Sequence, residues 1–289
     1  MKLTMRDNVW IVIALLAFAA TGCSSIPTGR YQAFSAASED VQSVISDTDA
    51  RIEKRQRDFA VLTAPNEPIT ANTFKPNIAG TIFDISSQLR SREAVLDVLV
   101  KYSKILESLA GKDSSSDVDK SAQNLAASLN GLPAIGDGST AAKLFATLTD
   151  NLAGAITKSK RKDALRNAMT TAQPAVVVIS KLLQRDYDKI EMFVNLMRDR
   201  YIAHANADRP PFGTWQRYKF DSEVAAGLEE FQQINDALAA ASTAIQKLPE
   251  AHQQLLEGLD NKEPPLNALR DVIHETQRLR SFYHDLPSN

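Results

Sequence analysis

One cysteine is present among the 289 residues of this sequence. A single cysteine cannot close an intramolecular disulfide, so packing and hydrogen bonds must hold the fold, and a disulfide-stapled scaffold is excluded. Glycine, with 11 residues, and aromatic residues, at 7%, are also scarce, whereas 44% of the chain is hydrophobic. This balance favours helix over sheet, and no segment sustains the period-two alternation of a half-buried strand.

Strong net charge and catalytic motifs are also absent. The formal net charge is −2, which gives the chain as a whole no attraction for nucleic acid or an anionic membrane. The sequence contains no Gly-x-Ser-x-Gly elbow, no P-loop and no Gly-x-Gly-x-x-Gly turn. We therefore expect no nucleic-acid partner and no enzyme activity, the alternative being an active site assembled only in three dimensions.

The histidines lack the spacing of a metal site. A zinc-protease motif begins at His274-Glu275, but Arg278 occupies the position of its second histidine. We predict that the histidines are scattered on the surface, and we expect no metal and no other cofactor. His284 stands beside Asp285 and is open to a pH response, as any exposed histidine is. The four are His204, His252, His274 and His284.

The longest hydrophobic run lies at the N-terminus. It covers 12 residues, from Val9 to Ala20, and follows the positive residues Lys2 and Arg6. A helix needs roughly 20 apolar residues to cross a bilayer, so this run predicts the apolar segment of a signal peptide rather than a membrane span. The run leads directly to the one cysteine, Cys23.

The segment Ala20-Thr21-Gly22-Cys23 resembles the lipobox of bacterial lipoproteins. The resemblance implies that Cys23 receives a diacylglycerol anchor, that residues 1–22 are cleaved, and that the new N-terminus is acylated, for example with palmitate. Two or more acyl chains anchor a protein stably, so the implied partner of this end is a membrane. In a Gram-negative source, Ser24 after the cysteine implies the outer membrane, facing the periplasm. An ordinary secretory signal, with Cys23 incidental, is the alternative.

The rest of the chain predicts one helical domain on a short tether. We expect a lipoprotein signal peptide over residues 1–22, a lipidated tether over 23–30 and a helical bundle domain over 31–289, with a sub-boundary near 206–220 if the bundle divides. Removal of the signal peptide leaves 267 residues with a net charge of −3. The predicted fold class is all-α, an elongated bundle of about six to eight helices with one long irregular loop at 63–83.

Apolar residues at steps of three and four outline the helices, and prolines and glycines separate them. Pro174 is expected to kink its helix or to mark a new start, and Pro249 to start a separate helix. Asp84 or Ser86 is the expected cap of the second helix, and Gly111 its end. The predicted helices cover residues 31–62, 84–110, 116–130, 139–156, 161–205, 224–248, 249–259 and 266–283.

The first of these helices has an incomplete apolar stripe. Ile45, Ile52 and Phe59 recur at seven-residue steps, but Thr48 and Arg55 occupy the remaining positions of the stripe. A polar and a charged residue leave such a coiled-coil-like face only partly covered by apolar contacts. We expect another protein or a second copy of the chain to complete it.

Aromatic side chains gather in one proline-rich break between helices. Phe212, Trp215 and Tyr218 lie there, with Arg209 and Arg217 nearby. These residue types are enriched in binding hot spots and also suit stacking on a sugar, so Phe212, Trp215, Arg217 and Tyr218 form the candidate surface for a partner or ligand. Large aromatics are mostly buried, however, and this favours the alternative that Phe212 and Trp215 plug the open end of the bundle.

A short basic run is the second candidate site. Lys158, Lys160, Arg161 and Lys162, followed by Arg166, have the charge to contact anionic lipid headgroups. The alternative, which short charge runs favour, is a solvated helix junction. Cations are also stabilised near a helix C-terminus by the helix dipole.

These features predict a lipid-anchored cell-envelope protein that acts as a non-enzymatic interaction or structural module. Its expected partner is an envelope protein or a second copy of the chain. A carrier or sensor of an apolar ligand, a lipid or a peptide held between helices, is the alternative. A stoichiometric lipid in the purified protein would favour the carrier.

Overall fold

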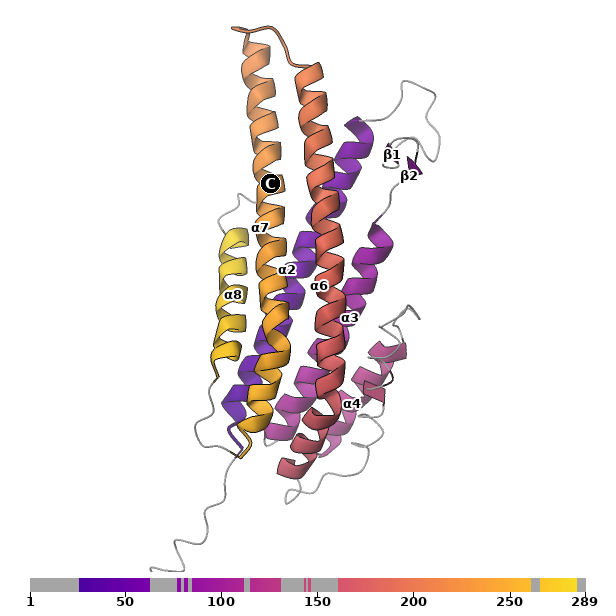
Figure 1. The fold of residues 1–289 in the computed structure, drawn as a ribbon, viewed down its shortest axis with the longest axis vertical. Helices are drawn as coiled ribbons and strands as arrows, with labels where there is room; N and C mark the ends of the chain where they lie inside the picture. The colour runs from indigo at the N-terminus through magenta and orange to yellow at the C-terminus, as the bar shows by residue number, and fades with distance from the viewer. Residues whose placement is uncertain are drawn as a thin grey trace, which may run out of the picture.

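The computed structural model describes residues 26–62, 77–78, 81–82, 85–111, 115–130, 143, 145–146, 161–260 and 266–284. Over these residues the chain forms an elongated bundle of six helices, which confirms the predicted all-α fold class (Figure 1). Two short antiparallel strands pair Asn77 with Ile82 in the connection that was predicted to be irregular. The elements are α2 (Thr28–Leu62), β1 (Asn77–Ile78), β2 (Thr81–Ile82), α3 (Ser86–Ala110), α4 (Ser115–Asn130), α6 (Arg161–Ala207), α7 (Trp215–Glu257) and α8 (Asn267–His284).

Four long helices form the centre of the bundle. α2 contacts α3, α6 and α7, and α6 contacts α3 and α7; α4 lies against α3, and α8 against α7 and α2. α2 begins at the bottom of Figure 1, and the turn between α6 and α7 lies at the opposite end. At a rise of 1.5 Å per residue, the 47 residues of α6 span about 70 Å, which sets the length of the molecule.

Pro249 lies within α7, so the prediction that it starts a separate helix is wrong. A proline has no N–H to bond the carbonyl four residues before it. Here that carbonyl belongs to Ile245, and it accepts a hydrogen bond from Ser180 Oγ of α6 at 2.8 Å instead. The Pro249 carbonyl accepts from Gln173 Nε2 at 3.2 Å, next to Pro174 within α6. α6 thus supplies the polar partner that lets α7 continue.

Two helix starts differ from the prediction. α2 begins at Thr28, so three residues of the predicted tether are helical, and the Thr28 hydroxyl donates to the last carbonyl of α3 at 3.0 Å. α3 follows Ile85, and Ser86 is its first residue rather than its cap, while Asp84 lies outside the described residues. Ile85 is buried and makes no capping hydrogen bond, so packing defines this start. Gly111 ends α3 as predicted.

Two predicted segments, the helix over 139–156 and the signal peptide with Cys23, lie mostly or wholly outside the described residues. Of the helix predicted over 139–156, only Lys143, Phe145 and Ala146 are described, and all three are helical. Phe145 is fully buried, and its ring centroid lies 5.1 Å from that of Tyr102, so this segment packs on the bundle. Cys23 and the signal peptide are not described. Among the helices that are, none combines the length and the apolarity that a membrane crossing requires.

The polar residues in the stripe of α2 have partners within the chain. Thr48 is buried, and its hydroxyl donates to the Val44 carbonyl at 2.7 Å. The Arg55 guanidinium pairs with Glu230 of α7 and lies 5.4 Å from the centre of the Phe231 ring. The expectation that another protein or a second copy completes this stripe is therefore wrong, because the chain itself buries Thr48 and pairs Arg55 with α7.

One ion pair is buried where α2, α3 and α6 meet. Arg92 of α3 pairs with Asp49 of α2, and the exposed fractions of their side chains are 0% and 5%. The Arg92 guanidinium also lies 4.8 Å from the centre of the Tyr187 ring. Burial lowers the pKa of Arg92, and the neighbouring Tyr187 and Asp186 act in the opposite direction. Arg92 of α3 thus contacts α2 through Asp49 and α6 through the Tyr187 ring.

Candidate functional site

The hairpin of α6 and α7 extends beyond the end of α2 at one end of the bundle. The contact of Arg55 with Glu230 places those residues of α2 and α7 at the same level. From that level α7 continues to Trp215 and α2 only to Leu62, so at 1.5 Å per residue the hairpin projects about 12 Å beyond the end of α2. Figure 1 shows this projection at its top. We call residues 208–221 the hairpin tip.

The turn of the hairpin tip is held by its own hydrogen bonds. Gly213 has a φ of 82°, a conformation that residues with a Cβ rarely adopt. The Thr214 hydroxyl caps α7 by accepting from the Arg217 N–H at 3.1 Å, and it donates to the Pro211 carbonyl at 2.9 Å. The Arg217 guanidinium donates to the Pro210 carbonyl at 2.9 Å. The turn therefore has one well-defined shape.

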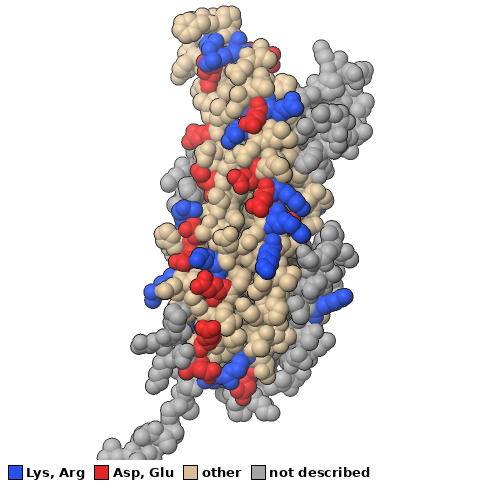
Figure 2. Space-filling model, in the orientation of Figure 1, with Lys and Arg blue, Asp and Glu red and all other residues tan. Residues whose placement is uncertain are grey.

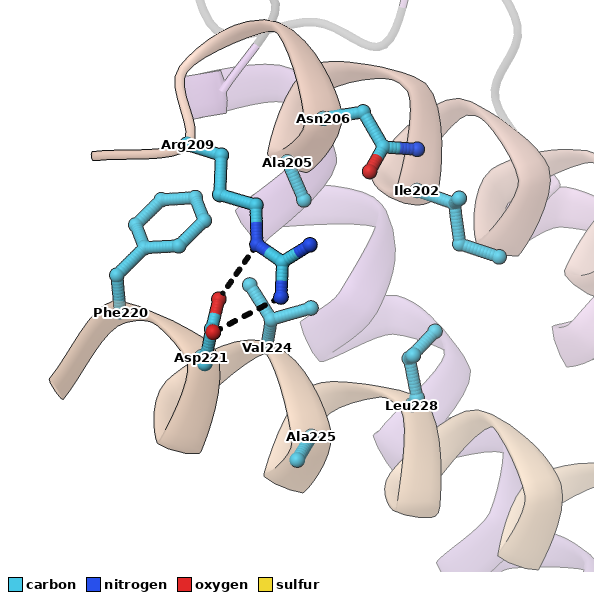
Figure 3. A pocket seen from close by; sticks show the side chains of 9 residues that line it. All are labelled: Ile202, Ala205, Asn206, Arg209, Phe220, Asp221, Val224, Ala225 and Leu228. Carbon is cyan, nitrogen blue, oxygen red and sulfur yellow. Dashed lines mark hydrogen bonds and ion pairs between the residues drawn. The ribbon is translucent and has the colours of Figure 1, made fainter. Parts of the chain in front are cut away.

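Two arginines share one carboxylate behind this turn. Arg209 makes two hydrogen bonds of 2.8 Å to the two oxygens of Asp221 (Figure 3). Arg217 Nε donates to the same carboxylate at 2.9 Å. The hydrogen bonds from Arg209 and then Arg217 lower the pKa of Asp221 to about 2. The bond to Asp221 in turn raises the pKa of Arg209. This cluster ties the end of α6 to the first turns of α7.

The aromatic side chains of the hairpin tip point outward. The exposed fractions are 93% for Phe212, 67% for Trp215 and 62% for Tyr218. The Trp215 and Tyr218 rings stack with centroids 5.0 Å apart, and Lys219 Nζ lies 5.8 Å from the centre of the Trp215 ring. The prediction that Phe212 and Trp215 plug the end of the bundle is therefore wrong. α2 ends below this level, so it cannot cover them.

A small cleft lies between the two helices just behind the hairpin tip. Its volume is about 250 Å³, and the Arg209–Asp221 pair forms part of its wall (Figure 3). Next to it the helices approach closely, since a Cβ on Gly227 would lie 2.6 Å from Tyr201 Oη. The cleft is mainly apolar. Its lining residues are Ile202, Ala205, Asn206, Arg209, Phe220, Asp221, Val224, Ala225 and Leu228.

A second polar cluster is buried in the body of the bundle, and the sequence reading missed it. His252 is fully buried, so the prediction that all four histidines lie on the surface is wrong. Its Nε2 lies 2.6 Å from Tyr102 Oη, and its Nδ1 contacts Gln173 Oε1. The Gln173 amide nitrogen donates to the Pro249 carbonyl, which leaves its oxygen to accept from Nδ1–H. The Tyr102 hydroxyl then donates to Nε2.

This cluster is built to keep its members uncharged. Burial lowers the pKa of His252 to about 3 and raises the pKa of Tyr102 well above its ordinary value. The helical spacing contained the signal that was missed, because His252 is four residues after Leu248 and three before Leu255, both on the buried face of α7. Tyr102 and His252 are both fully buried, so the bundle encloses the pair.

The described part of the basic run pairs with the protein itself. Arg161 donates to the Gly111 carbonyl at the end of α3. Lys162 Nζ lies 3.3 Å from Asp260, and Arg166 pairs with the same carboxylate. Lys158 and Lys160 lie outside the described residues. The described cations thus join the start of α6 to the ends of α3 and α7.

Within the described ranges, no three His, Cys, Asp or Glu side chains group so that they could hold a metal ion. The hairpin tip is the candidate site, because it combines exposed aromatic side chains with a turn that is held by its own hydrogen bonds. A comparison with protein-family models, curated proteins and solved structures finds no match to this chain.

Proposed function

We propose that the protein is a lipid-anchored module of the cell envelope that works without catalysis, by presenting the hairpin tip at a fixed distance from its anchor. The lipobox-like segment supports the anchor, and α2 begins five residues after Cys23. The tip lies at the opposite end of the bundle (Figure 1). The 47 residues of α6 make that distance about 70 Å.

The observation that carries this proposal is the exposure of three aromatic rings on a braced turn. Exposed large apolar side chains that cluster, rather than occur singly, mark interaction sites. Trp, Tyr and Arg are also the residues that contribute most to binding at interfaces. The hydrogen bonds of Thr214 and Arg217 fix the turn before any partner arrives, which lowers the entropy that binding would otherwise cost.

The carrier of an apolar ligand has less support. Pockets for small molecules usually measure about 300–1,000 Å³, whereas the cleft behind the hairpin tip measures about 250 Å³. The contacts between the central helices are filled by side chains such as Phe34, Leu96 and Ile245, each exposed by 1% or less. A ligand held between these helices would have to displace them.

Two measurements test the anchor and the tip separately. Cys23→Ser is expected to leave the membrane fraction and to lose its acyl mass, as shown by fractionation and intact mass spectrometry. In the anchored chain, a photoreactive phenylalanine analogue at position 212 is expected to crosslink to another envelope component. The same analogue at Met192, 67% exposed on the side of α6, is the matched control and is expected not to.

Each result can overturn one half of the proposal. Retention of the Cys23→Ser protein in membranes would contradict anchoring through this residue. Equal crosslinking from positions 192 and 212, or crosslinking from neither, would contradict a role that is specific to the hairpin tip.

A further inference from the structure

We propose that the hairpin tip inserts into the headgroup region of a lipid bilayer that faces the one holding the anchor, so that the protein bridges two lipid surfaces. This inference names the partner of the proposed function and rests on it for the anchored end. The contact of the tip with lipid is argued from the tip alone.

The first argument is the kind of side chain at the apex. Phe212, the most exposed of the large hydrophobic side chains described, lies at the turn itself, with Trp215 and Tyr218 on the first turn of α7. Trp and Tyr are enriched where proteins meet the membrane–water interface, because one end of each ring system is apolar and the other polar. The Trp215 and Tyr218 rings stack on each other, and Phe212 lies three residues before Trp215 in the same turn.

The second argument is the backbone of the turn. Water that could bond a loop's N–H and carbonyl groups becomes scarcer from the headgroup region toward the hydrocarbon core, so pairing within the loop lowers the cost of insertion. Pro210 and Pro211 have no N–H, and their carbonyls accept hydrogen bonds from Arg217 and from the Thr214 hydroxyl. The Thr214 carbonyl accepts from the Tyr218 N–H at 3.2 Å.

The third argument is charge. The hairpin tip contains Arg209, Arg217 and Lys219 against the carboxylates of Asp208 and Asp221, a net charge of +1, whereas the predicted mature chain carries −3. Asp221 is also shielded by both arginines. In Figure 2 uncharged atoms occupy the outermost part of the molecule at its top, and charged atoms lie just behind them. An apolar apex backed by net positive charge suits a bilayer with anionic headgroups.

The fourth argument is position. The residue that would carry the lipid precedes α2, and α2 starts at the end of the bundle farthest from the tip (Figure 1). A continuous α6, about 70 Å long, separates the two ends. A tether of only five residues before α2 keeps the bundle close to its anchor. The tip therefore reaches a facing bilayer when the bundle stands upright.

Trp215 makes the test direct, because it is the only tryptophan in residues 23–289. The mature acylated protein is reconstituted in donor vesicles of phosphatidylethanolamine and phosphatidylglycerol. Acceptor vesicles of the same lipids, with brominated acyl chains, are then added. We expect the Trp215 emission to shift to the blue and to be quenched by the acceptor vesicles. Acceptor vesicles of phosphatidylcholine alone are expected to quench less, because they lack anionic headgroups.

Two variants make the result specific. Phe212→Ser removes the apex and is expected to weaken association with the acceptor vesicles by about tenfold. Met192→Ser removes an exposed apolar side chain from the body of the bundle and is expected to change nothing. Both replaced side chains are largely exposed, so both variants keep the fold.

The remaining outcomes contradict the inference. Quenching only when the brominated lipid is in the donor vesicles would place the tip on the membrane of its own anchor. No quenching from either population, with Phe212→Ser equal to the unchanged chain, would exclude lipid and leave a protein partner. Flotation of the protein with donor vesicles before mixing distinguishes these results from a failure of the anchor itself.

Discussion

The bundle body, in which α2 and α3 pack on α6 and α7, and the hairpin tip place polar and apolar side chains in opposite ways. The body encloses the side chains of Arg92, Asp49 and His252, each exposed by 5% or less. The tip exposes Phe212 and Trp215 by two thirds or more and keeps its charged pairs at the surface. A buried charge must be paired with a group of opposite charge or with hydrogen bonds. A cluster of exposed aromatic rings is typical of a surface that binds another molecule.

The number of helices at each level explains the difference. In the body, α6 packs against α2 and α3 as well as α7, and α7 packs against α2 and α8 as well as α6. At the tip only those two helices remain among the described elements (Figure 1), and Phe212, Trp215 and Tyr218 there are largely exposed. Contacts within the chain therefore determine which side chains suit the body, whereas the exposed side chains of the tip are available to a partner. Four predictions test this contrast.

The largest expected effect is the loss of the buried ion pair in the body. Arg92→Leu leaves Asp49 charged, buried and without its guanidinium, and we expect the free energy of unfolding to fall by about 3–5 kcal/mol. Urea unfolding followed by circular dichroism measures this. In the double variant, with Asp49→Leu as well, most of the loss is expected to be recovered, because no charge is left buried. A double variant no more stable than the single one would contradict this reading of the pair.

The second effect is a pH dependence of the body. Burial lowers the pKa of His252 to about 3 in the folded chain, from 6.5 in the unfolded chain. Between these values the unfolded state binds a proton that the folded state does not, so stability is full above pH 6.5 and falls as the pH falls. From pH 7 to pH 5 we expect this histidine to cost about 2 kcal/mol, measured by urea unfolding at each pH.

The control for this prediction is His252→Gln, which keeps a polar side chain but does not titrate. Its stability is expected to depend less steeply on pH, by about one proton, over the same range. The Tyr102 hydroxyl that faces the histidine stays protonated throughout, because its pKa is raised by burial. Equal slopes for the variant and the unchanged chain would show that His252 does not titrate differently on unfolding.

The helices of the body could be predicted from the sequence because their signal is local. Apolar residues at steps of three and four identify α2, α3, α4, α6, most of α7 and α8 within a few residues. The error at Pro249 has a distant side, since the carbonyl of Ile245 that its helix leaves without an N–H partner is bonded by Ser180, 65 residues away along the chain. The stripe of α2 likewise depends on Glu230, 175 residues from Arg55. No local pattern contains such pairings.

The candidate site was only half predictable, for a related reason. Residue types selected Phe212, Trp215 and Tyr218, but their exposure depends on how far α7 extends past α2. That length depends on the level at which α2 and α7 meet, marked by the pairing of Arg55 with Glu230, which the sequence does not reveal. His252 shows the reverse case. Its spacing to Leu248 and Leu255 placed it on a buried face, and its polar side chain obscured that signal.

The third effect concerns the close approach of α6 and α7 behind the tip. Gly227→Ala would gain about 1 kcal/mol of helix propensity, but the new Cβ would lie 2.6 Å from Tyr201 Oη and force that ring aside. We expect the two terms to cancel nearly, and thermal unfolding to change little. In a Tyr201→Ala background the clash is absent, so the same change is expected to stabilise by about 1 kcal/mol. Identical effects in both backgrounds would show that the two residues are not coupled.

The smallest expected effect defines the tip most clearly. Phe212→Ser removes a ring that is 93% exposed and leaves the hydrogen bonds of Thr214 and Arg217 intact. The free energy of unfolding should therefore stay within about 0.5 kcal/mol of the unchanged chain, measured by urea unfolding. A loss of more than about 1 kcal/mol would mean that this ring stabilises the fold after all. If Phe212→Ser loses vesicle association while its free energy of unfolding is unchanged, the ring contributes to binding and not to the stability of the fold.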